Sequence, residues 1–251
     1  MSGLLVARRG SLSRHRPAAA LDYAAEVAVD SPVAWWRFEE TSGSTVADEV
    51  GSNDGTVFGA NLNVASFADT GSAASFDGTD DYIIVSDTST VEMTSAGGFT
   101  VEVLAKIDSP SASKLQVIAD KTGLSSGNGQ WWLGWDNRRG EKSFRFVVPT
   151  SSGTNTLLAG GATIETAVTD GGHFAFVKHS NKTELYVNGA FHSDNTGLTF
   201  SIATNSINLG IGNRAAQVNF SLGGDLDELA MYDKVLSPAR ILAHAQAAGV
   251  A

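Results

Sequence analysis

The chain has 251 residues, of which 42% are hydrophobic and 18% are charged, with 27 glycines and no cysteine. This apolar content is enough for a folded core, and the lack of cysteine excludes disulfides, cysteine-ligated metals and cysteine nucleophiles. Residues 1–20 carry four arginines and no acid, whereas the rest of the chain carries 13 basic and 27 acidic residues. A body this acidic repels phosphates, so we expect no nucleic-acid binding.

We divide the chain into a basic N-terminal arm, residues 1–22, and one domain, residues 23–251. Two interpretations of the arm stay open: it binds an acidic partner, or it is a solvated terminus. The apolar run 4–7 is too short for a signal peptide, and no stretch is long and apolar enough for a membrane helix, so we expect no membrane insertion. The residues that would bind a partner are Arg8, Arg9, Arg14 and Arg16.

From about Leu21 the sequence consists of short apolar or alternating runs separated by Gly, Asn, Asp and Ser, which is the pattern of β-strands. In chain order the clearest predicted strands are residues 33–38, 75–76, 82–85, 99–107, 116–119, 130–135, 143–148, 174–177, 184–187, 207–210 and 226–231. One helix is predicted over residues 238–248, with Ser237 as N-cap, Pro238 in the first turn and Gly249 as the stop.

Many strands with one terminal helix predict an all-β protein, a single antiparallel β-sandwich. Several motifs resemble the laminin G-like branch of the concanavalin A-like lectin/glucanase superfamily. They extend over about residues 23–245, and the resemblance implies a jelly roll. To it the sequence pattern adds the short C-terminal helix and an extended N-terminal arm. The motifs are Asp30–Glu40, Ser75–Val85 (SFDGTDDYIIV), Leu185–Gly189 (LYVNG) and Gly223–Asp233 followed by Leu236-Ser237. The chain departs from the family in lacking a tryptophan before His173.

The resemblance implies a structural calcium ion in many family members. The candidate ligands are Asp48, Asn53, Asp54 and Asp227, which we expect to meet at one edge of the sandwich; Ca²⁺ prefers such oxygen ligands. An alternative stays open, in which the loop aspartates form Asx turns and Asp227 is a fold-setting hydrogen-bond acceptor. A second acidic group is predicted to be a turn; it comprises Asp77, Asp80 and Asp81.

Related jelly rolls that hydrolyse glycans carry two glutamates and an aspartate alternating on one strand. The nearest match here is Asp225–Glu228, which lacks the first glutamate. We expect Asp227 and Glu228 to point to opposite faces, so the chain is predicted to be non-catalytic. Residues 123–127 match G-x-S-x-G, but no helix is predicted after them, so they are not a nucleophile elbow.

Trp131, Trp132 and Trp135 lie in one segment, with Trp131 on the face opposite Trp132. We name Trp131 and Trp135 as candidate ligand-binding residues, because an exposed tryptophan stacks on sugar rings. The alternative is packing in the core, which is the commoner use of buried aromatic residues.

These observations predict a non-catalytic virion-surface protein, of a phage tail or capsid, that displays a laminin G-like module for glycan or host-surface binding. The resemblance supports this, since such domains occur in phage minor tail proteins. The arm would attach the protein to other virion proteins, and we expect many copies in the assembly. Three alternatives remain: a purely structural decoration protein of a virion, an extracellular location, and a degenerate glycoside hydrolase.

Overall fold

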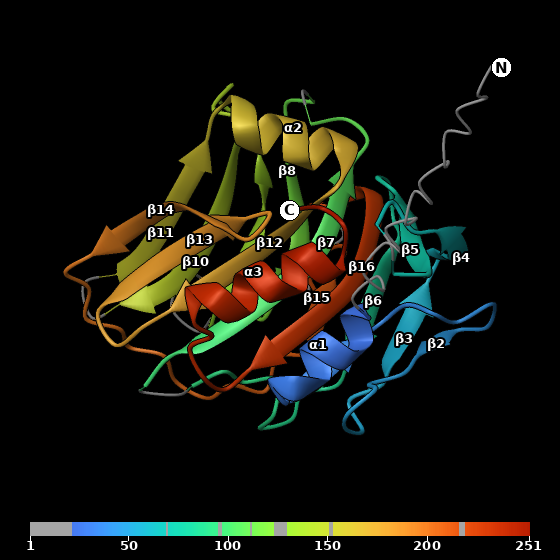
Figure 1. Cartoon of the computed structure of the whole chain (residues 1–251), viewed down its shortest axis with the longest axis horizontal. Helices are drawn as coiled ribbons and strands as arrows, with labels where there is room; N and C mark the ends of the chain where they lie inside the picture. Colours follow the sequence, from blue (N-terminus) through green and yellow to red (C-terminus); the bar gives the residue numbers. More distant parts are fainter. Residues whose placement is uncertain are drawn as a thin grey trace, which may run out of the picture.

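The computed structural model describes residues 22–68, 70–94, 97–110, 112–122, 130–150, 153–215 and 219–251. Two antiparallel sheets pack face to face as a sandwich, with three short helices at the surface (Figure 1). This confirms the predicted all-β jelly roll. The four arginines of the arm and the segment 123–127 lie outside the described residues.

Sheet A has the strand order β14-β13-β12-β7-β16-β5-β4, and β1 also pairs with β16. Its strands are β1 (Ala34–Trp36), β4 (Asn61–Ala65), β5 (Ser72–Asp77), β7 (Phe99–Ile107), β12 (Gly172–Lys178), β13 (Lys182–Val187), β14 (Ala190–Thr196) and β16 (Gly223–Tyr232). The pairing of β1 with β16 joins the start and the end of the domain, because Trp35 lies opposite Ala230.

Sheet B has the strand order β11-β10-β9-β8-β15-β6-β3-β2. Its strands are β2 (Thr45–Val46), β3 (Gly55–Phe58), β6 (Tyr82–Val85), β8 (Leu115–Asp120), β9 (Trp132–Asp136), β10 (Ser143–Thr150), β11 (Gly153–Gly160) and β15 (Leu209–Ile211). Neighbouring strands are often far apart in sequence, as expected for a jelly roll, so the sandwich depends on long-range pairing.

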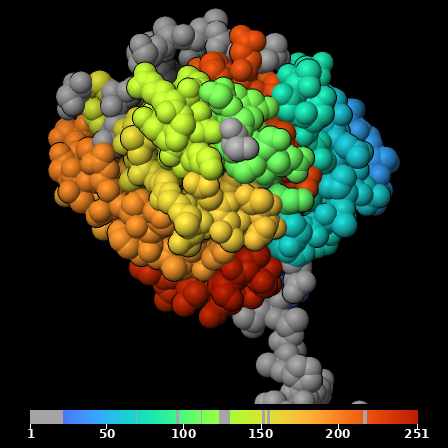
Figure 2. Space-filling model, turned by 90° about the horizontal axis from the view of Figure 1, so that it is seen from above, coloured from blue at the N-terminus to red at the C-terminus, as the bar shows by residue number. Residues whose placement is uncertain are grey.

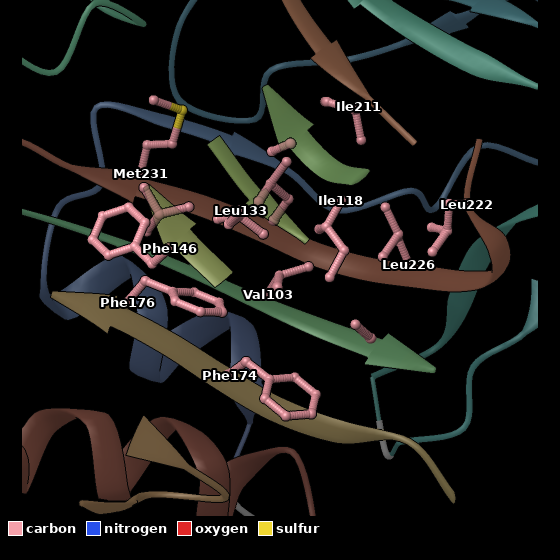
Figure 3. Close-up of a cluster of buried hydrophobic side chains, with 14 of the residues drawn as sticks. Val103, Ile118, Leu133, Phe146, Phe174, Phe176, Ile211, Leu222, Leu226 and Met231 are labelled. Carbon is pink, nitrogen blue, oxygen red and sulfur yellow. The ribbon is translucent and has the colours of Figure 1, made fainter. Parts of the chain in front are cut away.

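The core fills the space between the two sheets. Alternate residues of each strand point into it, as the two-residue repeat of a strand requires. On β7 these are Val101, Val103 and Ala105, and on β10 they are Phe144 and Phe146; all five are buried. Figure 3 shows Phe146 beside Phe176, with Val103, Phe174 and other apolar side chains around them.

Helices α1 (Tyr23–Val29) and α3 (Pro238–Ala247) pack against each other and against the outer face of sheet A (Figure 1). The predicted C-terminal helix is confirmed, with Ser237 accepting from the Arg240 backbone N–H at its start. Helices α1 and α2 (Ala162–Asp170) were not predicted, because they have only seven and nine residues and weak periodicity. None of the described helices is long and apolar enough to cross a membrane.

The two outer faces of the sandwich therefore differ. Tyr23 and Val27 of α1 and Ile241 of α3 are buried in a second apolar cluster on the outside of sheet A. Among the described residues, no helix covers the outer face of sheet B. In Figure 2, α3 (red) lies along the lower edge, and α2 (yellow) separates it from the lime and green residues of sheet B.

Gly212 follows β15 and has a positive φ of 76°. A Cβ atom there would lie 2.3 Å from the ring of Phe76, which is buried and cannot move aside. Gly140 has nearly the same φ, 77°, but an added Cβ would meet nothing within 4 Å. Gly140→Ala should therefore cost only the positive-φ penalty, about 1–2 kcal/mol. Gly212→Ala should cost about 1–3 kcal/mol more through overpacking.

Urea denaturation of the two variants and the wild type measures this difference. Equal losses of unfolding free energy in both variants would contradict the close contact between Gly212 and Phe76.

Candidate functional site

The open face of sheet B carries one row of outward-pointing residues that crosses five strands. Trp132 on β9 pairs with Asp120 on β8, and Asp120 pairs with Gly210 on β15. Gly210 in turn pairs with Ile84 on β6, and Ile84 with Thr56 on β3. Their strand neighbours Leu133, Ala119, Ile83 and Val85 lie in the core, so the row faces outward.

Trp132, Arg214, Phe220 and Asp120 form a compact group on this face, which we call the Trp132 cluster. The guanidinium of Arg214 lies 5.6 Å from the ring centre of Trp132 and 4.4 Å from that of Phe220. Both contacts are within the range of cation–π attraction. The side chains of Trp132, Arg214 and Phe220 are half-buried, so each keeps part of its surface accessible to solvent.

Asp120 holds Arg214 in place from below. Its Oδ2 lies 3.0 Å from Nε of Arg214, and its Oδ1 accepts hydrogen bonds from the backbone N–H and the hydroxyl of Thr122. Burial raises the pKa of Asp120 to about 6, and the charge of Arg214 only partly opposes this rise. The ion pair is therefore present at neutral pH and lost below about pH 6.

A half-exposed tryptophan beside a fixed guanidinium offers two types of contact to a ligand. The aromatic rings offer apolar surface, and the guanidinium N–H groups that do not face Asp120 are hydrogen-bond donors. Sugars present both apolar C–H faces and hydroxyl acceptors, so the group suits them. The sequence indicated a tryptophan in this segment, but not Arg214 or Phe220, which lie more than 80 residues further along the chain.

The structure corrects the prediction for the two other tryptophans. Trp131 and Trp135 are completely buried and belong to the core between the sheets. Trp131 packs against Phe99, and Trp135 packs against Phe144 and donates its indole N–H to the carbonyl of Pro110. Neither ring can reach a ligand. Trp132 is the outward-pointing member of the segment.

The predicted calcium ligands do not form one site. Asp48, Asn53 and Asp54 do come together in the loop after β2, but Asp48 is fully engaged with N–H donors. Its Oδ1 accepts from the backbone of Trp35 and Val50, and its Oδ2 accepts from both nitrogens of Asn53. Asp54 accepts from the backbone N–H of Asp48. Oxygens that already accept N–H bonds are poor ligands for a cation. The geometry of this loop therefore favours the alternative in which its aspartates form Asx turns.

Asp227 lies elsewhere, on the outer face of sheet A. It accepts hydrogen bonds from the hydroxyls of Ser66 and Thr70, at 2.7 and 2.5 Å. It thus has the alternative role, a buried acceptor that fastens the loop before β5. The structure does not gather Asp227 with Asp48 and Asp54, since no close group of three acidic side chains among the described residues contains them.

The expectation that Asp227 and Glu228 point to opposite faces was also wrong. The strand register shifts between Asp227 and Ala230, and Glu228 has a positive φ of 52°. This β-bulge turns both carboxyl groups outward, because Leu226 and Leu229 on either side both enter the core. Glu228 accepts from the indole N–H of Trp35.

Both carboxyl groups are inaccessible to solvent. Burial raises the pKa of Asp227 to about 7, against the effect of the two hydroxyl donors. Burial and the neighbouring Asp227 together raise the pKa of Glu228 to about 8, although Arg37 pairs with it at 3.1 Å. Desolvation of Glu228 thus outweighs its ion pair.

The acidic group Asp77, Asp80 and Asp81 is confirmed as a turn. Asp77 accepts from the backbone N–H groups of Thr79 and Asp80, and Asp81 accepts from that of Asp77. Oxygens of the three carboxylates lie within 4.8 Å of one another. Within the described part of the chain, no other group of three acidic or histidine residues is this close.

A buried charged network lies beneath α3, and no sequence motif indicated it. Glu102 of β7 is in contact with His173 of β12 at 3.2 Å and with His244 of α3 at 2.9 Å, and it accepts from the Tyr232 hydroxyl. Burial alone would raise the pKa of Glu102, but the charge of His244 and hydrogen bonds from both histidines hold it well below its ordinary value. Both histidines are completely buried and have a structural role.

A profile of the concanavalin A-like lectin/glucanases superfamily matches residues 77–242, about two thirds of the chain. The chain belongs to this superfamily. The match confirms the resemblance read from the motifs, and it includes β6 to β16 with both Trp132 and Arg214. A search of curated proteins found no match to the sequence.

Solved structures with this fold include several binding domains. Domain 4 of AbnA, an extracellular arabinanase from Geobacillus stearothermophilus solved with arabinotriose, is 18% identical with a TM-score of 0.62, over 85% of this chain and 98% of that domain. The binding domain of Paraclostridial Mosquitocidal Protein 1 is 13% identical with a TM-score of 0.66, over 85% of this chain and 51% of that one.

The ligand-binding domain of botulinum neurotoxin serotype D, solved with N-acetylneuraminic acid, is 14% identical with a TM-score of 0.62, over 88% of this chain and 52% of that one. Our chain thus spans about half the length of the two toxin domains. At these identities the likeness shows a common jelly-roll fold.

The raised pKa of Asp227 predicts a pH dependence of stability. In the unfolded chain the pKa of Asp227 has its ordinary value of 3.8, whereas in the folded chain it is about 7. The folded state therefore retains the proton longer, and stability should fall as the pH rises from about 4 to about 7. Asp227→Asn keeps an oxygen for Ser66 and Thr70 but cannot ionise, so it should reduce this fall.

Thermal unfolding of both proteins between pH 4 and 9 measures the effect. Asp108→Asn, which changes an exposed acid, is the control and should follow the wild type. Parallel curves for wild type and Asp227→Asn would contradict the assigned shift.

Proposed function

We propose that this chain is a non-catalytic glycan-binding module whose binding surface is the outer face of sheet B, centred on the Trp132 cluster. The observation that carries the proposal is the half-buried Trp132 ring, part of which is accessible, beside Arg214, which Asp120 fixes in place. No described helix covers this face, while helices cover the outer face of sheet A. A preorganised aromatic and cationic surface binds a ligand at a low cost in side-chain ordering.

Two features of the same face favour binding over hydrolysis. Its buried acids are occupied: Asp120 pairs with Arg214, and Asp136 pairs with Arg138 and Arg145. Asp120 pairs with Trp132 on β9, and Asp136 lies four residues further along that strand. This spacing places the carboxylates of Asp120 and Asp136 about 14 Å apart. Glycosidase carboxylates lie only about 5–9.5 Å apart. On sheet A, Asp227 and Glu228 are adjacent but lie beneath other residues, where a sugar cannot reach them.

The structural neighbours give the proposal its ligand class. One neighbour was solved with arabinotriose and another with N-acetylneuraminic acid, and both share the jelly-roll fold with this chain. They support a carbohydrate ligand, while the residues that would bind it come from this chain's own geometry.

A glycan array carrying arabino-oligosaccharides, β-glucan oligosaccharides and sialylated glycans tests the proposal. The wild-type protein should bind at least one class, and Trp132→Ala and Arg214→Ala should each weaken that binding about tenfold or more, the effect of losing roughly 1.4 kcal/mol. The matched control is Phe191→Ala, which removes an exposed aromatic ring from sheet A. The proposal fails if no glycan binds, or if the Trp132 variant binds as well as the control.

We further propose that the module is displayed on a virion surface, in many copies, and attached through its basic arm. The support is the charge asymmetry of the sequence, four arginines in residues 1–20 beside an acidic body. Mass spectrometry of purified particles should detect the chain, and deletion of residues 1–20 should release it. Its absence from particles would instead favour an extracellular protein, and retention after the deletion would contradict attachment through the arm.

A purely structural decoration protein remains the second candidate, because a sandwich with one open sheet face can pack on a capsid or tail. The array and the particle experiment together separate the two: retention on particles without glycan binding favours decoration.

A further inference from the structure

We propose that the ligand of sheet B is an extended, uncharged oligosaccharide that contacts two aromatic positions, the Trp132 cluster and the ring pair Phe58–Tyr82. This inference rests on the proposed function, because it defines the ligand of the same face. It adds a second contact position, a minimum ligand length and a charge preference.

Phe58 and Tyr82 form a flat aromatic surface on neighbouring strands. Their ring centres lie 4.7 Å apart with an angle of 17° between the planes, so the rings are stacked. The exposed fraction of Phe58 is 43%, although such a ring gains by burial. Stacking keeps both rings in a fixed orientation, and an exposed, ordered aromatic surface is typical of a binding position.

The ring pair lies on the same face as Trp132. Ile83 and Val85 of β6 point into the core, so their neighbours Tyr82 and Ile84 point outward. Phe58 pairs directly with Tyr82, two residues along β3 from Thr56. Thr56 ends the outward row that begins at Trp132.

Strand spacing gives the distance between the two positions. Four strand intervals separate β9 from β3, and neighbouring strands lie about 4.8 Å apart, so Trp132 and Phe58 are about 20 Å apart. A single sugar cannot contact both rings. A chain of several sugars lying across the strands can.

The segment after β15 lies between the two positions. It crosses directly over Gly210, since a Cβ there would lie 2.4 Å from the Asn213 carbonyl and 2.5 Å from the Ala215 amide. Arg214 leaves this segment toward Trp132 and away from β6, because it pairs with Asp120 of β8. The face thus has an aromatic surface on each side of a low backbone ridge, and a ligand must pass over the ridge to bridge them.

Charge selects against acidic sugars at the Phe58 end. Asp81 adjoins Tyr82 in sequence, and one of its oxygens would lie 1.9 Å from a Cβ placed on Gly59, next to Phe58. Asp77 and Asp80 lie beside Asp81 and are exposed. Three carboxylates there repel a uronic or sialic acid. At the other end, Asp120 already neutralises Arg214, so that end has little net attraction for an anion.

Titration calorimetry with arabino- and cello-oligosaccharides, from the mono- to the octasaccharide, tests the inference. For the wild type, affinity in at least one series should rise on the order of 10- to 100-fold once the ligand is long enough to reach both positions, because the second contact becomes intramolecular. Phe58→Ala should remove this rise and leave the affinity for short ligands unchanged. Trp132→Ala should weaken binding at every length, and Phe191→Ala should change nothing.

Oligogalacturonides of the same lengths provide the charge comparison and should bind more weakly than the neutral series, most clearly at low salt. Equal affinity for short and long ligands, an unchanged length dependence in Phe58→Ala, or stronger binding of the acidic series would overturn the inference while leaving the proposed glycan-binding function intact. Absence of binding to all three series would contradict the inference, and together with a negative glycan array it would contradict the function as well. Binding that Trp132→Ala does not weaken would contradict both.

Discussion

The arrangement of the molecule depends on one buried carboxylate, Glu102. It lies in the middle of sheet A with no access to solvent, and a buried charge is tolerated only where other groups compensate it. The compensation comes from His173 and Tyr232 on the two flanking strands and from His244 on α3. Helix α3 must therefore lie over this point of the sheet, since its removal would leave Glu102 without its main partner.

The same contact chain fixes α1. The second imidazole nitrogen of His244 lies 3.1 Å from Asp30, which directly follows α1, and Arg240 of α3 pairs with both Asp30 and Glu26. Two helices from opposite ends of the domain are thus joined to each other and to the sheet. Together with the β1–β16 pairing, they close the outer face of sheet A. The bulge at Asp227 and Glu228 adds two further buried acids to this closed face, so it is built for stability and not for access.

Sheet B is organised in the opposite way. On its outer side Asp120 pairs with Arg214 and Asp136 with Arg145, and neither pair joins the sheet to a helix. Its aromatic residues divide by strand parity: Trp131 and Trp135 fill the core, whereas Trp132 and Tyr82 face outward. Helices cover the outer face of sheet A and not that of sheet B, which is why the proposed binding surface lies on sheet B. The main residues of that surface come from segments far apart in sequence, because strand pairing brings them together.

Much of the fold was determined by the sequence itself. Alternating runs identified the strands, the Ser237-Pro238 start identified α3, and the motifs from Ser75 to Tyr232 identified the family, because strand periodicity and turn chemistry are local properties. Residue parity also placed Trp131 opposite Trp132, but it did not say which side was the core. The packing of the two sheets decides which side is the core. Because of it the candidate ligand contact is Trp132, and not Trp131 or Trp135.

Long-range pairing decided the rest. The Asp227 carboxyl group is engaged by Ser66 and Thr70, which lie 161 and 157 positions away in sequence. A β-bulge that no residue pattern indicated turns Glu228 to the same side as Asp227. The Glu102 network joins residues 71 and 142 positions apart, and Arg214 reaches Trp132 only through the pairing of β15 with β8. Such contacts depend on which strands become neighbours, and in a jelly roll the tertiary structure alone decides this.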